Sequence, residues 1–170
     1  LPAREIITLA HSAEYYDAFA SGTVDPKIIR RIGLPWSIEL FLRSLASVGG
    51  AIGAARSAME CGIGGNLAGG THHAFRDHGE GFSMHGEKNY PFNKVASTID
   101  IELVDSTGDE EYLSLLKKNL TAIFEWKPDI ILYQAGVDPL AEDSLGRLSL
   151  TLNGLMERDK LVLGECKKHG

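Results

Sequence analysis

Two adjacent histidines, His72 and His73, stand in a glycine-rich stretch of the chain, within the sequence GGTHH. Neighbouring side chains of an extended backbone point in opposite directions, so this pair is poorly arranged to chelate one metal ion. It suits proton transfer better, because an imidazole with its ordinary pKa of about 6.5 can accept or donate a proton near neutral pH. One ring would move the proton while the other orients a substrate oxygen. The alternative is a pair of surface histidines in a loop.

Asp138 lies shortly after an apolar run at residues 129–134 and immediately before Pro139. A carboxylate presented by a loop at the end of a strand is well placed to hold a divalent cation. A turn-forming aspartate or a helix N-cap is the alternative interpretation. We expect the nearby Asp143 to have a structural role, paired with Arg147.

Gly81 and Phe82 end the sequence HGEGF, which combines a permissive backbone with an aromatic wall. Such a segment is useful where a narrow substrate must pass close to the main chain, although many glycine-rich turns are only turns. The chain contains no P-loop, no GxGxxG fingerprint and no GxSxG nucleophile elbow. Phosphate-binding, dinucleotide-binding and serine-hydrolase functions therefore lack support.

Strand-like and helix-like patterns alternate along the chain. Short apolar or period-two runs predict strands, and apolar residues at three- and four-residue steps after an N-cap residue predict helices. The alternation predicts an α/β fold with a largely parallel sheet and ligand sites at the carboxyl ends of its strands. The predicted elements are strands at 5–10, 98–103 and 129–134, and helices that begin after Ser12, Ser37 and Asp109 and at about Thr151.

The helix that begins after Ser37 and ends at Gly62 is the longest predicted element. Three glycines interrupt it, and each weakens a helix by about 1 kcal/mol relative to alanine. We therefore expect close packing against another helix at Gly49, Gly50 and Gly53. The apolar spacing predicts a core-facing helix. Its apolar residues are Leu40, Phe41, Leu45, Val48, Ile52, Ala55 and Met59.

Composition narrows the classes of function. A chain of 170 residues with 44% hydrophobic residues has material for one ordinary core, which predicts a single domain. Its net charge of −6 argues against direct nucleic-acid binding. Two cysteines without metal-type or disulfide spacing indicate a reducing compartment. With no signal peptide and no apolar run near the 20 or so residues of a membrane span, we expect no membrane association and a cytoplasmic or nuclear location.

Several stretches together resemble the zinc-dependent histone deacetylase superfamily, especially its class IV and bacterial, acetoin-utilisation branches. The most specific are the tandem-histidine motif NLAGGTHHAFRDHGEGF and the motif LYQAGVDPLAEDSLGRLSLT. The similarity covers nearly the whole chain. The matching stretches are residues 66–82 and 132–151, with FSMHGEKNYPF at 82–92, TGDEEYL at 107–113 and IGLPWS at 32–37.

The resemblance implies a three-layer arginase/deacetylase-like fold and zinc-dependent hydrolysis of N-acetyl or longer acyl groups on lysine or lysine-like amines. The substrate would be an acetylated lysine peptide or another acetylated amine. By motif, His72 and His73 would be the catalytic proton-handling pair, and Asp138 would be a zinc ligand. Gly81 and Phe82 would line the channel for the acylated side chain.

The chain departs from the family pattern at the junction of Phe82 and Ser83. In the family, a helix and a buried strand follow GEGF and end in an Asp-x-His motif with two of the three zinc ligands, but no Asp-x-His occurs in these 170 residues. We therefore expect one truncated domain over residues 1–170 with an internal deletion at 82/83 and an incomplete metal site. The family's N-terminal strand and a later loop tyrosine are also outside the chain. A pseudoenzyme or splice product that acts as a binding module is the alternative. A lost central strand would leave neighbouring edges and apolar faces exposed.

Overall fold

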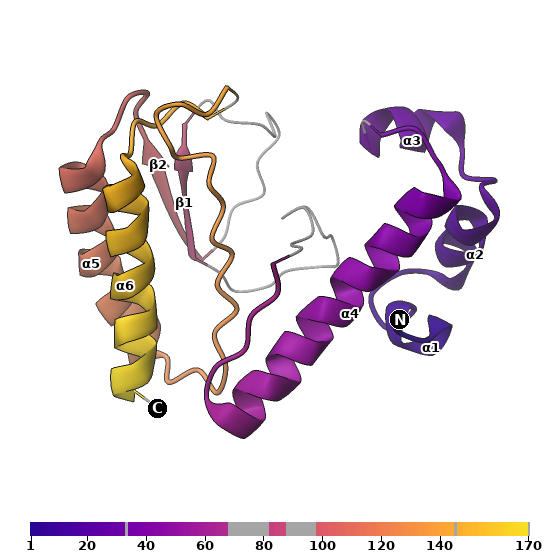
Figure 1. Cartoon of the computed structure of the whole chain (residues 1–170), viewed down its shortest axis with the longest axis horizontal. Helices are drawn as coiled ribbons and strands as arrows, with labels where there is room; N and C mark the ends of the chain where they lie inside the picture. The colour runs from indigo at the N-terminus through magenta and orange to yellow at the C-terminus, as the bar shows by residue number, and fades with distance from the viewer. Residues whose placement is uncertain (33, 68–81, 88–97, 145, 170) are drawn as a thin grey trace. The chain divides into compact units, whose positions relative to one another are not determined.

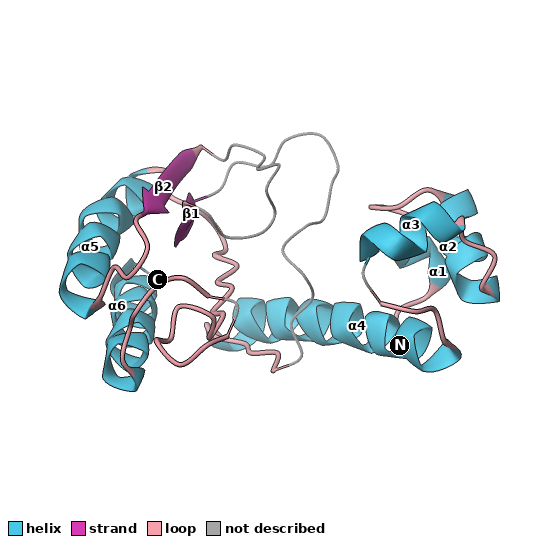
Figure 2. Cartoon of the chain, turned by 90° about the horizontal axis from the view of Figure 1, so that it is seen from above, coloured by secondary structure: helices cyan, strands magenta, loops and turns pink. Residues whose placement is uncertain are grey.

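The chain divides into two compact units, Leu1–Arg76 and Asp77–Gly170 (Figure 1). The structure is a computed structural model, and it describes residues 1–32, 34–67, 82–87, 98–144 and 146–169. The described part of the first unit is helical, whereas that of the second combines helices with a small parallel sheet (Figure 2).

The first unit begins with helix α1 (Arg4–Ile7), where the sequence predicts a strand. This prediction is wrong. The carbonyl of Ala3 accepts hydrogen bonds from the N–H groups of Ile6 and Ile7, so the segment satisfies its backbone locally. A strand would need a neighbouring strand for the same purpose, and Ile6 and Leu9 are exposed rather than buried on a sheet.

Helix α3 (Pro26–Ile32) was not among the elements predicted from the sequence. Proline is favoured at the first position of a helix because its missing N–H has no intrahelical partner there. The carboxylate of Asp25 accepts a hydrogen bond from the N–H of Lys27 at 2.7 Å, as an N-cap residue does. The signal for this helix was therefore present in the dipeptide Asp25–Pro26.

The predicted caps of the two other helices are confirmed. The hydroxyl of Ser12 accepts from the N–H of Tyr15 at the start of α2 (Ala13–Ser21). Ser37 accepts from the N–H of Leu40 at the start of α4 (Ile38–Cys61). Both helices end at glycines with left-handed φ angles of 74° and 83°, which glycine adopts without a steric penalty. These glycines are Gly22 and Gly62.

Helix α4 is less buried than its pattern predicts. Leu45 is its one buried residue, while Val48 and Met59 are exposed, Met59 by 82%. Most of the expected core face is thus not covered by described residues of the first unit.

Helix α4 is long and apolar enough to cross a membrane, with a mean hydropathy of 1.3. The prediction that no stretch of the chain has the length and hydropathy of a membrane span is therefore wrong. One such helix is a weak indication, because core helices of soluble proteins have the same character.

Two glycines of α4 are sites of close approach, although to connecting segments rather than to a helix. A Cβ atom on Gly49 would lie 3.1 Å from Pro2, and one on Gly50 would lie 2.6 Å from the side chain of Asn66. No heavy atom within the described part lies within 4 Å of the corresponding position at Gly53. The predicted close packing is therefore confirmed at two of the three positions, and the predicted helical partner is wrong.

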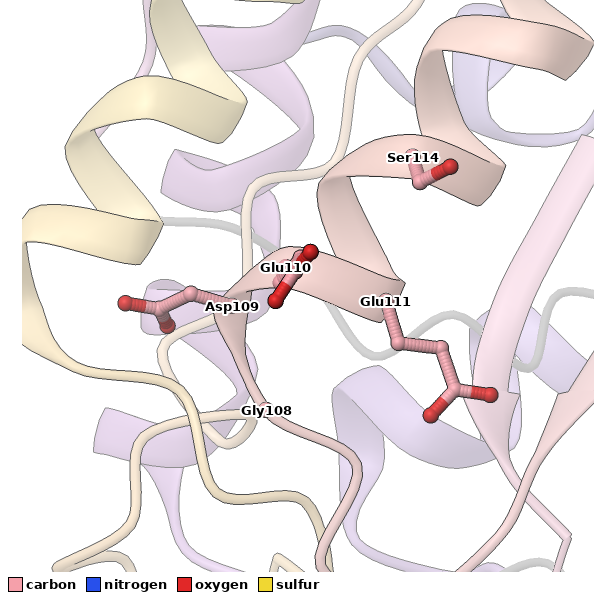
Figure 3. A pocket seen from close by; sticks show the side chains of 5 residues that line it. All are labelled: Gly108, Asp109, Glu110, Glu111 and Ser114. Carbon is pink, nitrogen blue, oxygen red and sulfur yellow. The ribbon is translucent and has the colours of Figure 1, made fainter.

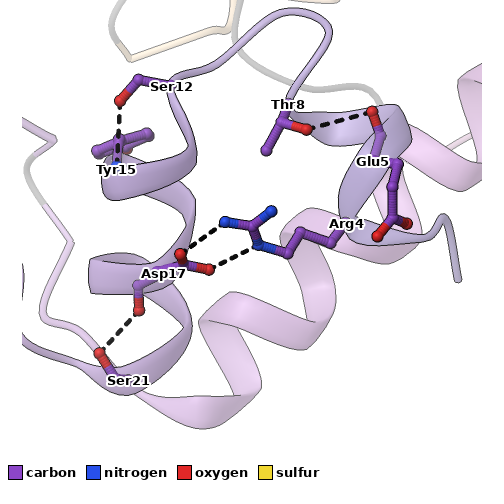
Figure 4. A network of polar contacts seen from close by, with 7 residues as sticks. All are labelled: Arg4, Glu5, Thr8, Ser12, Tyr15, Asp17 and Ser21. Atoms are coloured by element: carbon purple, nitrogen blue, oxygen red, sulfur yellow. Dashed lines mark hydrogen bonds and ion pairs between the residues drawn. The ribbon is translucent and has the colours of Figure 1, made fainter.

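An exposed ion pair joins α1 to α2 (Figure 4). The guanidinium of Arg4 donates to both carboxylate oxygens of Asp17, at 2.8 and 2.7 Å. The hydrogen bond from Arg4 lowers the pKa of Asp17 below its ordinary value. Because the pair is open to water, it orients the two short helices more than it stabilises them.

The second unit contains a parallel pair of strands. Strand β1 (Phe82–Gly86) runs beside β2 (Ile99–Leu103), with Phe82 opposite Ile99 and Gly86 opposite Leu103. The predicted strand at 98–103 is confirmed, and so is the parallel, α/β character of this unit.

Helices α5 (Asp109–Glu125) and α6 (Leu152–His169) pack together beside these strands and enclose the core of the second unit. Both helices were predicted. Helix α5 begins one residue earlier than predicted, because Gly108 and not Asp109 is its N-cap. Asp109 instead accepts from the N–H and the hydroxyl of Thr151, at 2.8 and 2.6 Å, and so fixes the start of α6. The buried core residues are Leu103, Tyr112, Leu116, Leu120, Leu148, Leu150, Leu155 and Val162.

The segment 129–134 is the main failure of the strand predictions. It is neither helix nor strand, and Leu132 is 80% exposed. Among the described residues, the backbone groups of 129–135 have no hydrogen-bond partner. A run this apolar forms a buried strand only when neighbouring strands pair with it, so the absence of a described neighbour explains its irregular course.

Candidate functional site

Asp138 lies in an exposed turn of the second unit. The carbonyl of Val137 accepts from the N–H of Leu140 at 3.0 Å and closes this turn. On the C-terminal side, the N–H of Leu150 donates to the carbonyl of Pro139 at 3.0 Å. Because Leu150 is fully buried, this bond attaches the turn to the core. Asp138 is therefore presented by a loop that is anchored directly after it.

Gly136 sets the surroundings of Asp138 on the N-terminal side. A Cβ atom on Gly136 would lie 2.5 Å from Oδ1 of Asp138, so the carboxylate folds back over the glycine. The carbonyl of Gly136 accepts a hydrogen bond of 2.7 Å from Nη1 of Arg158. A larger residue at position 136 would displace the carboxylate, which explains why glycine suits this position.

Arg158 is the centre of a polar cluster beneath the loop. It is 4% exposed, although it carries a charge. Its Nε donates to Oδ1 of Asp159 at 2.9 Å, and the hydroxyl of Tyr133 donates to the same oxygen at 2.6 Å. The guanidinium also lies 5.9 Å from the centre of the Tyr133 ring. The buried charge is thus paired and hydrogen-bonded, as burial of an ion requires.

The cluster shifts the pKa values of its members. Burial raises the pKa of Tyr133, and the hydrogen bond that it donates to Asp159 raises it further. Burial also raises the pKa of Tyr112, which the charge of Arg158 partly offsets. Burial lowers the pKa of Arg158, but the hydrogen bond to Asp159 and the charge interactions with Tyr133, Asp159 and Tyr112 together outweigh this effect and leave the pKa raised. Both phenols are therefore neutral at neutral pH.

The predicted pairing of Asp143 with Arg147 is wrong. Oδ1 of Asp143 accepts from the N–H of Gly146 at 2.7 Å, whereas Arg147 pairs with Asp105 at 3.2 Å. Asp143 thus closes its own loop, as aspartates in turns commonly do. Its structural role was predicted, and only its partner differs.

The other predicted site residues cannot be placed relative to Asp138. His72, His73 and Gly81 lie outside the described residues. Phe82 begins β1, but its side chain is outside the described part as well. Their roles in proton transfer and in lining a substrate channel remain predictions.

The described residues do not fit a zinc centre. No group of three or more His, Cys, Asp or Glu side chains that could hold a metal ion occurs among them. A catalytic zinc ion takes three protein ligands and leaves one position open, and Asp138, the ligand predicted from the motif, would supply only one of them. The acidic hollow at the start of α5 does not replace them, because the carboxylates of Asp109, Glu110 and Glu111 point in different directions (Figure 3).

Sequence reasoning missed the cluster of Arg158, Asp159 and Tyr133. One signal for it was present, since Arg158 falls between Leu155 and Val162 on the apolar face of α6. A charged residue on the buried stripe of a helix indicates a partner for that charge inside the protein. The partner itself, the carbonyl of Gly136, lies 22 residues away and carries no sequence signal.

Comparisons with known proteins agree with the motifs. The model of the histone deacetylase domain matches residues 83–170, just over half of the chain. The whole chain is 35% identical to an uncharacterized protein of Picosynechococcus sp., covers 73% of it, and aligns over 219 residues. Histone deacetylase 2 of Arabidopsis thaliana is 34% identical over 46% of the chain, and histone deacetylase clr6 of Schizosaccharomyces pombe is 35% identical over 33%.

The extent of these matches differs among the relatives. The chain spans 21% of the Arabidopsis protein and 14% of the S. pombe protein, which are therefore much longer. The family model includes the Asp138 loop and the Arg158 cluster within its matched residues. The predicted resemblance is confirmed at the level of the family, and the chain belongs to the histone deacetylase domain family.

Proposed function

We propose that the protein derives from a zinc-dependent deacylase that hydrolyses N-acetyl or longer acyl groups on lysine or lysine-like amines, and that its metal centre is incomplete in the chain as printed. The observation that carries this proposal is the family match over residues 83–170, within which Asp138 stands on an anchored loop. An acetylated lysine peptide or an acetylated amine would be the substrate. In the complete centre, zinc would polarise the amide carbonyl and activate water.

Each of the predicted site residues would then have its own role in catalysis. Asp138 would be one zinc ligand, His72 and His73 would transfer protons, and Gly81 with Phe82 would line the acyl-lysine channel. Two further zinc ligands are needed, and the sequence lacks the Asp-x-His motif that supplies them in the family. One carboxylate does not hold a catalytic zinc ion, so we expect no metal-dependent step from these 170 residues alone.

We propose further that an internal segment has been lost at the junction of Phe82 and Ser83. The Picosynechococcus relative aligns over 219 residues, whereas this chain has 170. The irregular and exposed course of 129–134 also supports the loss, since this run needs flanking strands. The complete protein would have the three-layer arginase/deacetylase-like fold, as one domain.

The test compares the 170-residue protein with a variant that carries the corresponding segment of the Picosynechococcus relative between Phe82 and Ser83. We expect substoichiometric zinc and no turnover of an acetyl-lysine peptide for the former, and one zinc ion with measurable turnover for the latter. Zinc is measured by mass spectrometry of the metal content. Asp138→Ala in the restored variant is the control and should lose both properties.

Two results would contradict this proposal. Stoichiometric zinc in the 170-residue protein would show that its metal centre is complete. A folded, zinc-loaded restored variant that turns over neither acetylated nor longer-chain acylated lysine peptides would exclude deacylation.

A second candidate function is that of a non-catalytic binding module. The exposed 129–134 segment favours it, because free backbone groups and apolar side chains suit pairing with an added strand. Binding of an acetyl-lysine peptide in the presence of a chelator, measured by fluorescence anisotropy, would support this function. The absence of such binding in a stably folded protein would exclude the retained substrate channel.

A further inference from the structure

We infer that Arg158 is a positioning residue for Asp138, which it acts on through the carbonyl of Gly136. This inference rests on the proposed function only in that Asp138 is a residue to which that proposal assigns a role. The contacts that carry it involve no metal ion. The effect of Arg158 would be to hold the peptide two residues before Asp138 in one orientation.

Arg158 anchors a stretch whose backbone is otherwise without hydrogen bonds to described residues. Within the described residues, the backbone of 129–135 has no hydrogen-bond partner, and the carbonyl of Gly136 is the first backbone group to gain one. The donor is the buried Arg158, at 2.7 Å. The chain is therefore fixed at Gly136 by a side chain of α6 rather than by a neighbouring strand.

Gly136 lies next to the carboxylate of Asp138, so the orientation of Gly136 affects where this carboxylate can lie. Oδ1 of Asp138 lies so near Gly136 that a Cβ atom on the glycine would come within 2.5 Å of it. On the other side, the carbonyl of Pro139 is held by the N–H of Leu150 at 3.0 Å. Asp138 thus stands between two anchors, and only the N-terminal one depends on a side chain.

Arginine suits position 158 because its donors lie on several nitrogen atoms. The guanidinium bonds Gly136 through Nη1 and Asp159 through Nε at the same time. A lysine ammonium at the end of a flexible chain carries its donors on one atom and cannot reproduce this fork. The network is completed by the hydroxyl of Tyr133, which shares Oδ1 of Asp159. Removing the guanidinium would take away the donor to the carbonyl of Gly136 and one of the donors to the carboxylate of Asp159.

The alternative is that Arg158 only stabilises the packing of α6. Both roles predict a loss of stability in Arg158→Met, so stability cannot distinguish them. The backbone amides of Val137 and Asp138 can, because they follow directly after the carbonyl that Arg158 holds. A role limited to packing would leave their resonances in place once charge is restored by Arg158→Lys.

The experiment records ¹H–¹⁵N spectra of the 170-residue protein and of Arg158→Met, Arg158→Lys and Gly136→Ala. Arg147→Met is the matched control, because it removes an exposed arginine of the same unit that pairs with Asp105. Gly136→Ala leaves Arg158 intact and so tests the loop even if the Arg158 variants fail to fold.

We expect both Arg158 variants and Gly136→Ala to shift the amides of Val137 and Asp138, and Arg147→Met to leave them unchanged. Unchanged amides in folded Arg158→Met, or their full recovery in Arg158→Lys, would overturn the inference. Because no metal ion is added, these outcomes do not depend on whether the complete protein is a deacylase.

Discussion

The long helices α4 and α6 differ in what covers their apolar faces. Both have an apolar stripe at helical spacing, and both contain glycines. In α6, the stripe meets α5, and Leu155 and Val162 are buried. In α4, Leu45 is the one buried residue, although this helix is longer and more apolar. Periodicity thus specified the helices equally well, but only contact with a second apolar surface determined burial.

The largest expected difference between α4 and α6 comes from one leucine substitution in each helix. Leu155→Ala should lower the free energy of unfolding by about 2–5 kcal/mol, because it creates a cavity in a packed core. Leu42→Ala in α4 should change it by no more than about 0.5 kcal/mol, since Leu42 is 45% exposed. Denaturant unfolding can follow each unit separately, because Trp36 lies in the first unit and Trp126 in the second.

Single-tryptophan backgrounds, Trp126→Phe and Trp36→Phe, would assign each transition to its unit. Equal losses for the two leucine variants would mean that the face of α4 is covered in solution and that the contrast between the helices is absent.

Glycine substitutions should have opposite signs in the two helices. A Cβ on Gly154 of α6 would overlap the carboxylate of Asp109, which holds Thr151, so Gly154→Ala should cost about 1–3 kcal/mol. Gly53→Ala in α4 meets no described atom within 4 Å and should stabilise its helix by up to about 1 kcal/mol. Thermal unfolding followed by circular dichroism measures both effects. Gly164→Ala, an open position within α6, is the control, and a loss there equal to that of Gly154→Ala would refute the proposed overlap.

The cysteines near the ends of the two helices offer a kinetic comparison. Cys61 of α4 is exposed, whereas Cys166 of α6 is partly buried, and burial raises the pKa of its thiol. Because the thiolate is the reactive form, a disulfide reagent at mildly alkaline pH should modify Cys61 faster than Cys166. The rates are measured in Cys166→Ser and Cys61→Ser. Equal rates in the folded protein and unequal rates after denaturation would contradict the assignment to burial.

The smallest expected effect concerns the polar link between α1 and α2 in the unit of α4. Arg4 lowers the pKa of Asp17 by its hydrogen bond, so the pair contributes stability above the ordinary carboxyl pKa. This contribution is lost as the pH falls through the lowered pKa of Asp17. Asp17→Asn should therefore destabilise the first unit slightly at neutral pH and not at strongly acidic pH. Unfolding of the Trp36 reporter at both pH values tests this sign, and an effect that grows on acidification would reverse it.

Local signals account for the parts of the fold that were predicted. Ser12 and Ser37 cap their helices because a hydroxyl can satisfy a free N–H two or three residues later in any environment. The alternation at 98–103 became β2, where β1 pairs with it. The runs at 5–10 and 129–134 look equally strand-like, but they have no described neighbour to pair with. A strand is a property of two segments, so one segment cannot specify it alone.

The candidate site likewise combines features that local sequence predicts with features that depend on distant segments. The motif around Asp138 identified the family and a candidate ligand, and the turn is where it was expected. Arg158 was missed because its partner is a backbone carbonyl, which every residue possesses. The partner of Arg147 was wrong because Asp105, 42 residues away, competes with the nearby Asp143.

The sequence by itself determined the helices, their caps, the family and the absence of an Asp-x-His motif, since each depends on residue type and short spacing. The tertiary structure decided which apolar faces are buried, that the 129–134 run remains unpaired, and that a buried arginine holds the loop of Asp138. These features require contact between two segments that are distant in the sequence. The free energy of such a contact depends on the surfaces of both segments.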